Sequence, residues 1–511
     1  MKRTLLYVVA LWLTLASSAF AQQPKKVTDK FFPEPDVEMN IPVFKKKSGF
    51  TNSVEMSNFI SDLILQYPEL IKMESVGKSQ RGRDIFLVTI SNSEYSGDKL
   101  RAFYYARVHG DEPSGTEAML YFIRQLLEDP SVGVLLEKID FYIIPMVNPD
   151  GAESFTRVTA NGIDLNRDQS KLDTPEAKAL HATVDHIQPH IAVDYHEYQP
   201  IRSDFAKLTS DIISTPWDIM FLYSGNPNVP QVLRDAVDSP FIANIGAEMD
   251  KYGLTHHTYF TSQDSFGKVS LTVGGSSPRS TSNAMALKGI ISLLMETRGI
   301  KLDRVSIKRR TWSAYLTAVN IARTAVDNED MVRDVVAQAI RDKGDIAVKF
   351  SGKSVTSDFK FLDIIKNSIV ELKVDARLSN ESRVTKSRSL PAAYWLLPSE
   401  IKAIETFGYM GIEVVKIDEP IEITVESYKV TSWKEDAEQV AGIHPIGVET
   451  QISDKVMTFP AGSYRIDMGQ RYLRAVSVLL EPESSSGFVS FRVIESKNGM
   501  ELPIYREKNK N

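Results

Sequence analysis

Two side chains that could bind a metal ion, His109 and Glu112, stand three positions apart directly after an apolar run. The run over residues 103–108 predicts a buried strand, and apolar residues at helical spacing over 119–127 predict a helix behind it. A turn between a strand and a helix can bring an imidazole nitrogen and a carboxylate oxygen onto one divalent cation, and these donors suit zinc. Such pairs also arise by chance, so a solvated loop is the alternative interpretation.

The elements that must position these side chains alternate between strands and helices. Strands are predicted over residues 85–90, 103–108, 139–147, 191–195 and 289–295, and helices over 56–64, from a Ser114–Glu117 capping box onward, over 175–187, around 232–251 and over 303–342. This order predicts an α/β fold whose sheet carries helices on both faces. His109, His196 and Glu296 each follow a predicted strand, where ligands of such sheets gather, so we expect them to form one site.

Six short motifs follow one another along the chain: Val76-Gly77-Lys78-Ser79 with Gly82-Arg83, His109-Gly110-Asp111-Glu112, Pro145-Met146-Val147-Asn148-Pro149-Asp150-Gly151, Asp164-Leu165-Asn166-Arg167, Asp194-Tyr195-His196-Glu197 and Glu296-Thr297-Arg298-Gly299. In this order they resemble the zinc carboxypeptidases of the carboxypeptidase A type. The resemblance covers roughly residues 45–325. It implies a mixed central sheet with helices on both faces, and hydrolysis of a peptide-type amide bond next to a free C-terminal carboxylate.

The resemblance also implies a catalytic centre. His109, Glu112 and His196 would hold one Zn²⁺ per chain and leave a fourth position for water. Zinc lowers the pKa of such a water toward neutrality. Glu296 matches the family's catalytic carboxylate, which acts as general base toward the water and then as proton donor to the leaving amine.

Further residues match the family's substrate-binding positions. Arg157 matches the arginine that stabilises the developing oxyanion, and Asn166 and Arg167 match the pair that holds the terminal carboxylate. Asp164 would accept the second ring hydrogen of a ligand histidine, expected to be His109, or would simply cap a turn.

The chain departs from the family's pattern in its specificity region. Where the family has a substrate-closing tyrosine, about twenty residues before the catalytic glutamate, this chain has residues 274–277, Gly-Gly-Ser-Ser, and Tyr259 is the nearest tyrosine upstream. The pocket segment 278–283 offers no carboxylate, and its Arg279 would receive an acidic group or form part of a loop. We also expect the segment 216–230 to shape the cleft and treat the pair His256–His257 as candidates for substrate contact.

The first residues predict an export signal. Lys2 and Arg3 precede an apolar run over residues 5–15, and Ala19-Phe20-Ala21 resembles a cleavage site, so we predict a signal peptide cleaved near Ala21. The run is short for a bilayer span. The absence of cysteine excludes disulfides, thiol chemistry and a lipid-modified cysteine. We therefore expect a periplasmic or secreted protein without a membrane anchor.

Length and composition set the domain organisation. A chain of 511 residues suggests two or three domains, and 42% hydrophobic with 25% charged residues is typical of globular proteins. The formal net charge of -6 gives no reason to expect a nucleic acid or an anionic membrane as partner. We predict a signal peptide over 1–21, an extended lead-in over 22–48, a catalytic domain over 49–342, and an accessory region rich in β-strands over 343–511. Strand-like runs at 346–350, 421–425, 464–468 and 475–480 support the last assignment.

The sequence therefore predicts an exported zinc metallocarboxypeptidase that acts on a peptide or peptide-like substrate. One alternative is a related zinc amidohydrolase that cuts N-acyl amino acids or cell-wall peptides, because the predicted pocket is open and polar. Another is a non-catalytic binding protein on the same fold. The intact Glu296 and the complete set of metal ligands argue against this second alternative.

Overall fold

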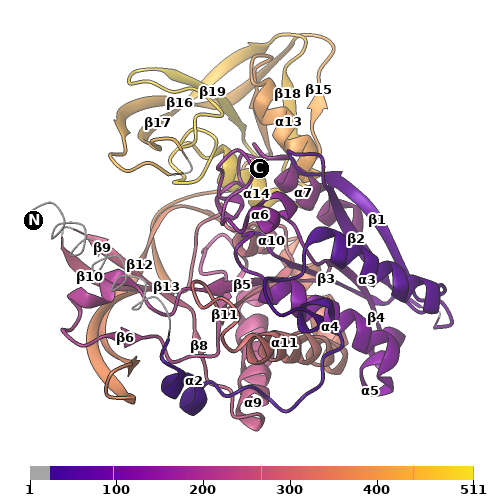
Figure 1. The fold of residues 1–511 in the computed structure, drawn as a ribbon. Coiled ribbons are helices and arrows are strands. Elements are labelled where there is room, and N and C mark those ends of the chain that lie inside the picture. The colour runs from indigo at the N-terminus through magenta and orange to yellow at the C-terminus, as the bar shows by residue number, and fades with distance from the viewer. Residues whose placement is uncertain (1–22, 96, 266, 441, 510–511) are drawn as a thin grey trace, which may run out of the picture.

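The computed structural model describes residues 23–95, 97–265, 267–440 and 442–509, so the predicted signal peptide lies outside the described residues. The chain forms a larger lobe and a smaller C-terminal lobe (Figure 1). Within the described ranges, no helix combines the length and the apolar character needed to cross a membrane.

An eight-stranded mixed sheet forms the centre of the larger lobe. Its spatial order is β1 (Ile71–Lys78), β2 (Asp84–Ile90), β4 (Ile139–Ile144), β3 (Leu100–Ala106), β5 (Ile191–Tyr198), β11 (Ile291–Arg298), β7 (Ile219–Tyr223) and β8 (His256–Thr258). The four central strands β4, β3, β5 and β11 run parallel, and the strands that flank them, β2 and β7, run antiparallel to them. Every residue of β5 and β11 is buried, as expected for strands covered on both faces.

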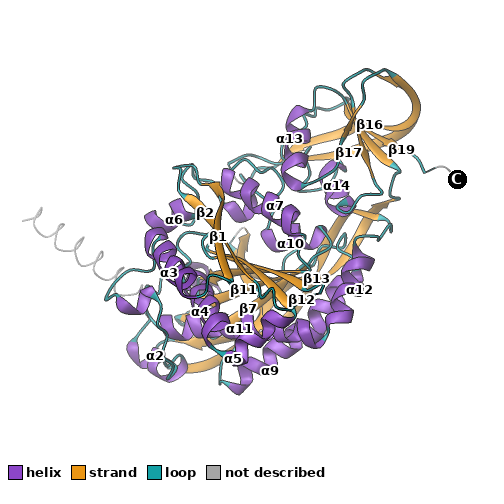
Figure 2. Cartoon of the chain, turned by 90° about the vertical axis from the view of Figure 1, so that its right-hand side faces the viewer, coloured by secondary structure: helices purple, strands orange, loops and turns teal. Residues whose placement is uncertain are grey.

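Helices cover both faces of this sheet, as predicted. One face carries α4 (Ser114–Glu128), α9 (Ala243–Lys251) and α11 (Ile307–Asp327), and the other carries α7 (Pro175–Ile187) and α10 (Thr281–Leu287). Figure 2 shows the two helical layers on opposite sides of the strands. The remaining helices of this lobe include α3 (Ser53–Gln66), α6 (Pro149–Ser154), α8 (Gln231–Ala236) and α12 (Glu329–Ala339). The sequence prediction of a mixed α/β fold is confirmed.

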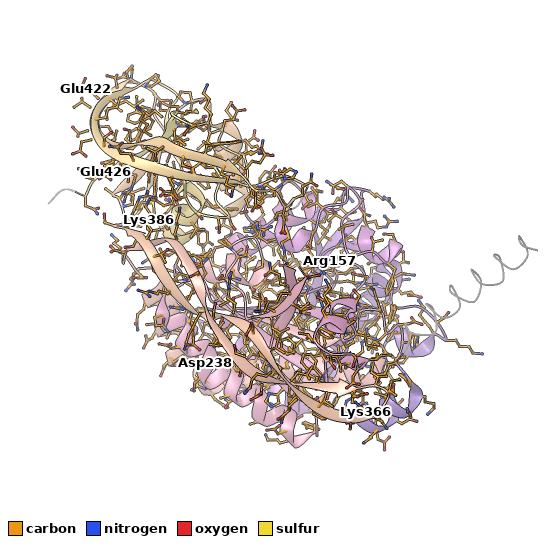
Figure 3. The ribbon with its side chains drawn as sticks, turned by 90° about the vertical axis from the view of Figure 1, so that its left-hand side faces the viewer. Arg157, Asp238, Lys366, Lys386, Glu422 and Glu426 are labelled. Carbon is orange, nitrogen blue, oxygen red and sulfur yellow. The ribbon has the colours of Figure 1, made fainter. Side chains whose placement is uncertain are left out.

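A five-stranded sheet lies beside the larger lobe's main sheet. Its order is β6 (Ile213–Ser214), β12 (Ile346–Asp363), β13 (Ser368–Arg388), β10 (Lys268–Val273) and β9 (Phe260–Ser265). Figure 3 labels Lys366, next to the turn of the long β12–β13 hairpin, and Lys386, at the opposite end beside the smaller lobe. Because strands from before and after residue 342 share this sheet, the domain boundary at that position stays a prediction.

The smaller lobe is rich in β-strands, as expected. Its six-stranded sheet has the order β15 (Val415–Lys416), β18 (Tyr464–Asp467), β14 (Ala393–Leu396), β19 (Glu501–Glu507), β16 (Ile421–Glu435) and β17 (Ile446–Phe459). It also contains α13 (Ile401–Met410) and α14 (Leu473–Leu480). The predicted strand over 475–480 is therefore wrong. Every residue of α14 is buried, and a short apolar run buried all round has no periodicity to separate strand from helix.

Two local predictions near the N-terminal half also differ from the structure. The lead-in over 22–48 contains a helix, α2 (Lys25–Phe31), and a 3-10 turn, Pro42–Lys45, rather than extended chain alone. The Ser114–Glu117 capping box does not form. The backbone N–H of Ser114 donates to Glu197 Oε1 at 2.8 Å, and the Glu117 carboxylate accepts from both the N–H and the hydroxyl of Thr51. Residues distant in the chain, Glu197 and Thr51, thus take the place of the predicted hydrogen bonds between Ser114 and Glu117.

A buried ion pair joins the long hairpin to the smaller lobe. Arg388, the last residue of β13, donates to Glu481 Oε2 at 2.6 Å and also contacts Glu483. Both glutamate side chains are fully buried. Glu481 also accepts from the Tyr394 hydroxyl at 2.7 Å and the Tyr428 hydroxyl at 3.0 Å. This network fixes the segment after α14 against the hairpin.

Replacing Arg388 with alanine should lower the free energy of unfolding by roughly 3–5 kcal/mol, because two buried carboxylates lose their guanidinium partner. Urea denaturation followed by tryptophan fluorescence measures this loss. The matched control is Lys353→Ala, which removes an exposed pair with Glu381 on the same hairpin and should cost at most about 1 kcal/mol. Equal losses in the two variants would contradict the structural role of the network.

Candidate active site

The turn after β3 presents the first two candidate metal ligands. β3 ends at Ala106, two residues before the predicted end, and Arg107 adopts a left-handed backbone conformation with φ of 57°. The buried Arg107 guanidinium donates to the carbonyls of Gly110 and Thr51 at 3.1 and 2.8 Å, which holds the turn. A Cβ on Gly110 would lie 1.9 Å from the carbonyl carbon of Gly151, so only glycine fits there.

The other two catalytic candidates lie within neighbouring strands. β5 and β11 continue to residues 198 and 298, three residues beyond the predicted ends, so the prediction that His196 and Glu296 follow the strand ends is wrong. The strands are parallel, and His196 is directly opposite Glu296 in their register. Both side chains still stand near the carboxyl edge of the sheet, which is where the turn after β3 delivers His109.

His109, Glu112 and His196 form a compact buried cluster. His109 Nδ1 lies 2.7 Å from Glu112 Oε1, His196 Nδ1 lies 2.7 Å from Glu112 Oε2, and the two Nδ1 atoms are 3.1 Å apart. In the part of the chain that the structure describes, these residues are the one group of histidine and acidic side chains placed to hold a metal ion. Two imidazole nitrogens and one carboxylate match the ligand set of a catalytic zinc, so the residues present fit this ion.

Hydrogen bonds assign the ring nitrogens of His109. An ionised carboxylate can only accept, and Asp164 Oδ1 approaches the ring nitrogen of His109 that points away from Glu112. His109 Nε2 then carries the proton and donates to Asp164 Oδ1 at 3.0 Å. This is the tautomer that a metal bound at Nδ1 requires. The predicted pairing of Asp164 with His109 agrees with this geometry, and Asp164 Oδ1 also accepts from the Asn166 N–H, which is the alternative turn-capping role.

His196 has an orienting carboxylate of its own, which the sequence prediction missed. Its Nε2 lies 2.7 Å from Asp194 Oδ2, and the same oxygen accepts from the Thr281 hydroxyl. Both Asp194 and His196 lie on β5, two positions apart, and residues with this spacing share one face of a strand. That spacing was the available signal in the sequence.

Charge interactions within the cluster are strong. Burial raises the pKa of Glu112, but the two histidines lower it more, so it lies well below its usual range. Burial lowers the pKa of His196, but Asp194 and Glu112 raise it more, so it lies well above its usual value. Both shifts have the same cause, the close approach of carboxylates and imidazoles within the cluster.

Glu296 lines the cleft beside this cluster and is 8% exposed. Its Oε2 is buried and has no hydrogen-bond partner among the described residues. Burial, together with the negative charges of Glu112 and Asp194, raises its pKa to about 8 even though His196 and Arg157 act in the opposite direction. A buried carboxylate without a partner is costly, and perturbed groups of this kind cluster at functional sites.

The predicted substrate-binding residues lie in the same cleft. Arg157, Asn166, Arg167 and Arg279 all line it together with Glu296, and Figure 3 places Arg157 in the part of the larger lobe nearer the smaller lobe. The Asn166 side-chain oxygen accepts from the N–H and the hydroxyl of Thr281, which leaves its NH₂ group, a donor, for the cleft.

The cleft has a volume of about 1490 Å³ and walls from both lobes. The smaller lobe contributes Lys434, Asp436, Val448, Glu483, Ser486, Ser490 and Phe491, among others. Tyr259 lines the cleft, as does Leu222 of the segment 216–230. Within the described residues, His256 and His257 do not line the cleft. The His256 ring stacks on Phe221 and the His257 ring stacks on Trp217, so both histidines have packing roles.

Comparison with known proteins finds carboxypeptidases. A family model described as zinc carboxypeptidase matches residues 56–192. Carboxypeptidase 2 of Trichophyton equinum and its counterpart in Trichophyton rubrum are each 30% identical over 472 residues, covering 90% of this chain and 87% of the relative. A solved metallo-carboxypeptidase from Burkholderia cenocepacia aligns with 55% of this chain and 70% of its own, at 16% identity and a TM-score of 0.42.

The mixed α/β sheet and the His-Glu-His cluster define a metal-dependent hydrolase of the carboxypeptidase type. The chain belongs to the zinc carboxypeptidase family. It is therefore an enzyme of the zinc metallopeptidase class, and zinc is its cofactor.

Replacing Asp194 with asparagine should weaken zinc binding by about 10–100-fold, because the partner that orients His196 loses its charge. Competition with a chromogenic chelator measures this affinity. Asp235→Asn, an exposed residue of α8, is the matched control and should bind zinc as the unmodified protein does. Unchanged affinity in the Asp194 variant would show that this carboxylate does not support the site.

Proposed function

We propose that this zinc carboxypeptidase is exported and removes residues from the C-termini of peptides, with Glu296 as its proton-transfer group. The observation that carries the proposal is the unpartnered Glu296 oxygen, buried in the same cleft as the His109–Glu112–His196 cluster. Bound by that cluster, zinc would supply a Lewis acid that polarises the scissile carbonyl and makes water a better nucleophile at neutral pH.

Glu296 takes the proton that the attacking water loses and later gives it to the nitrogen of the leaving amine. A carboxyl group whose pKa is raised toward neutrality by burial is a stronger base than a solvated one. The position of Glu296 opposite His196 in the strand register keeps it next to the metal ligands without making it one of them.

Arg157 supplies positive charge where the oxyanion forms. Its Nε donates to Asp164 Oδ2 at 3.0 Å, so the carboxylate that orients His109 also orients this guanidinium. The side chain is 41% exposed, which leaves donors available to a substrate carbonyl. A donor placed in advance needs no reorganisation as the charge develops.

Arg167 and Asn166 bind the terminal carboxylate of the substrate. The two residues are adjacent in a 3-10 turn, Leu165–Arg167, whose geometry is set by Asp164 and by the contact of Asn166 with Thr281. Arg167 Nη1 donates to the Asn166 carbonyl at 2.7 Å, which orients the guanidinium fork. A guanidinium beside an amide NH₂ presents several donors to one carboxylate.

The export part of the proposal rests on the N-terminal sequence pattern, with cleavage near Ala21 and a periplasmic or extracellular location. Residues 49–342 supply the catalytic groups, and the region from 343 onward completes the cleft wall.

Replacing Glu296 with glutamine should leave zinc bound and lower kcat by about 10²–10⁴-fold, because the proton acceptor is lost while the metal ligands remain. Mass spectrometry of a mixed peptide pool, incubated with zinc-loaded mature protein or with the variant, measures the loss of C-terminal residues. Equal activity of the two proteins would exclude Glu296 as the base. An untouched pool combined with release from N-acyl amino acids would replace peptides as the substrate class.

Replacing Arg167 with alanine should lower kcat/KM by about 10–100-fold for peptides with a free C-terminus, because charge-assisted hydrogen bonds to the carboxylate are lost. The slow turnover of the same peptides with an amidated C-terminus should change little. Arg202→Ala is a suitable control, since Arg202 lines the same cleft but already pairs with Asp204. A similar loss on both peptide forms would mean that Arg167 does not bind the carboxylate.

A further inference from the structure

The cleft contains an arginine, Arg279, that forms no ion pair with any described residue. Arg279 immediately precedes Ser280, the residue that caps α10, and its side chain lines the cleft. Its Nε and Nη1 are buried, and neither has a hydrogen-bond partner among the residues that the structure describes. Guanidinium groups are strong donors that cannot accept, so two buried donors without partners are costly.

The surroundings of Arg279 add positive rather than negative charge. Burial and the nearby Arg167 lower the pKa of Arg279 to about 10, whereas Asp164 acts in the opposite direction. Asp164 is already engaged by His109 and Arg157. Glu483, another acidic residue of the cleft, pairs with Lys386 and Arg388. Among the described residues no carboxylate forms an ion pair with Arg279, although Glu296 and Asp436 line the same cleft.

The smaller lobe supports this guanidinium with an aromatic ring. Arg279 lies 5.0 Å from the ring centroid of Phe491, a contact that holds a cation by its flat face. Phe491 is 3% exposed and comes from the segment after α14 that Arg388 anchors. A stacked guanidinium keeps its edge donors free, so the ring fixes the orientation of Arg279 without satisfying its hydrogen bonds.

Polar, uncharged side chains share the lining with Arg279. Ser276, Ser277, Ser280 and Asn283 come from the larger lobe, and Ser485, Ser486 and Ser490 from the smaller one. These side chains offer hydroxyl and amide groups to a polar substrate side chain. They suit a small side chain that ends in an anion.

We infer that Arg279, held against Phe491, forms a subsite for the side-chain carboxylate of a C-terminal glutamate or aspartate. This inference rests on the proposed function, in which Arg167 and Asn166 hold the terminal carboxylate. A C-terminal acidic residue carries two carboxylates, and the cleft offers a separate guanidinium to each. A neutral side chain leaves the buried donors of Arg279 unsatisfied, which is the situation in which polar sites discriminate most strongly.

The test compares matched peptides that end in Glu, Gln, Leu or Lys and are otherwise identical. The zinc-loaded mature protein should cleave the Glu peptide with kcat/KM at least about 10-fold above that for the Gln peptide, because only the anion pairs with Arg279. Arg279→Met should remove this preference through a higher KM for the Glu peptide, with little change for the Gln peptide. Arg279→Lys should restore part of it.

Two further variants separate recognition from folding. Phe491→Leu should reduce the Glu/Gln preference several-fold, because the guanidinium loses its support. Arg202→Met, which removes a paired arginine of the same cleft, should leave the preference unchanged. Thermal unfolding of each variant identifies any loss of the folded state.

Each outcome bears on the inference. Turnover without preference for Glu over Gln, or equal losses on all four peptides in Arg279→Met, would overturn the acidic subsite and leave the proposed function standing. Absence of cleavage of every peptide by the unmodified protein would overturn the proposed function, and the subsite with it.

Discussion

The active site depends on holding two imidazole rings and one carboxylate within hydrogen-bond distance of one another in the protein interior. Their Nδ1 atoms and the two oxygens of Glu112 meet at 2.7–3.1 Å, and each ring is held from behind by a carboxylate, Asp164 or Asp194. These outer carboxylates decide which nitrogen faces the centre. Without them the rings could rotate or change tautomer, and the ligand set would lose its geometry.

The same requirement explains several features that lie away from the metal cluster. Arg310 of α11 pairs with Glu197, which also accepts the N–H of Ser114 at the start of α4, so three elements are joined beside His196. The backbone N–H of Glu197 donates to Glu112 Oε2. Side chains outside the metal cluster are therefore linked to the metal ligands by one or two hydrogen bonds, and each of these buried charges has a nearby partner.

The smaller lobe contributes to the cleft rather than only extending the chain. Its segment after α14 reaches Arg279 through Phe491, and the Arg388 network holds that segment against the hairpin of the five-stranded sheet. The same segment carries Glu481 and Glu483, which pair with Arg388, and Phe491, which lies against Arg279. The cleft wall is thus shared by parts of the chain more than 200 residues apart, Arg279 and Phe491 among them.

The sequence by itself determined the α/β order of elements and the residue types of the catalytic centre. Periodicity and strand-ending turns are local, and the metal ligands stand in short motifs whose order along the chain identifies the family. Only the tertiary structure revealed the helix α14, the partners of Ser114 and Glu117, the role of Asp194 and the position of Phe491 beside Arg279. A run of residues that is buried on every side shows no hydrophobic periodicity, so the sequence does not distinguish a strand from a helix there. Hydrogen-bond partners depend on proximity in space. Contacts between residues distant in the chain follow from packing, which no local pattern records.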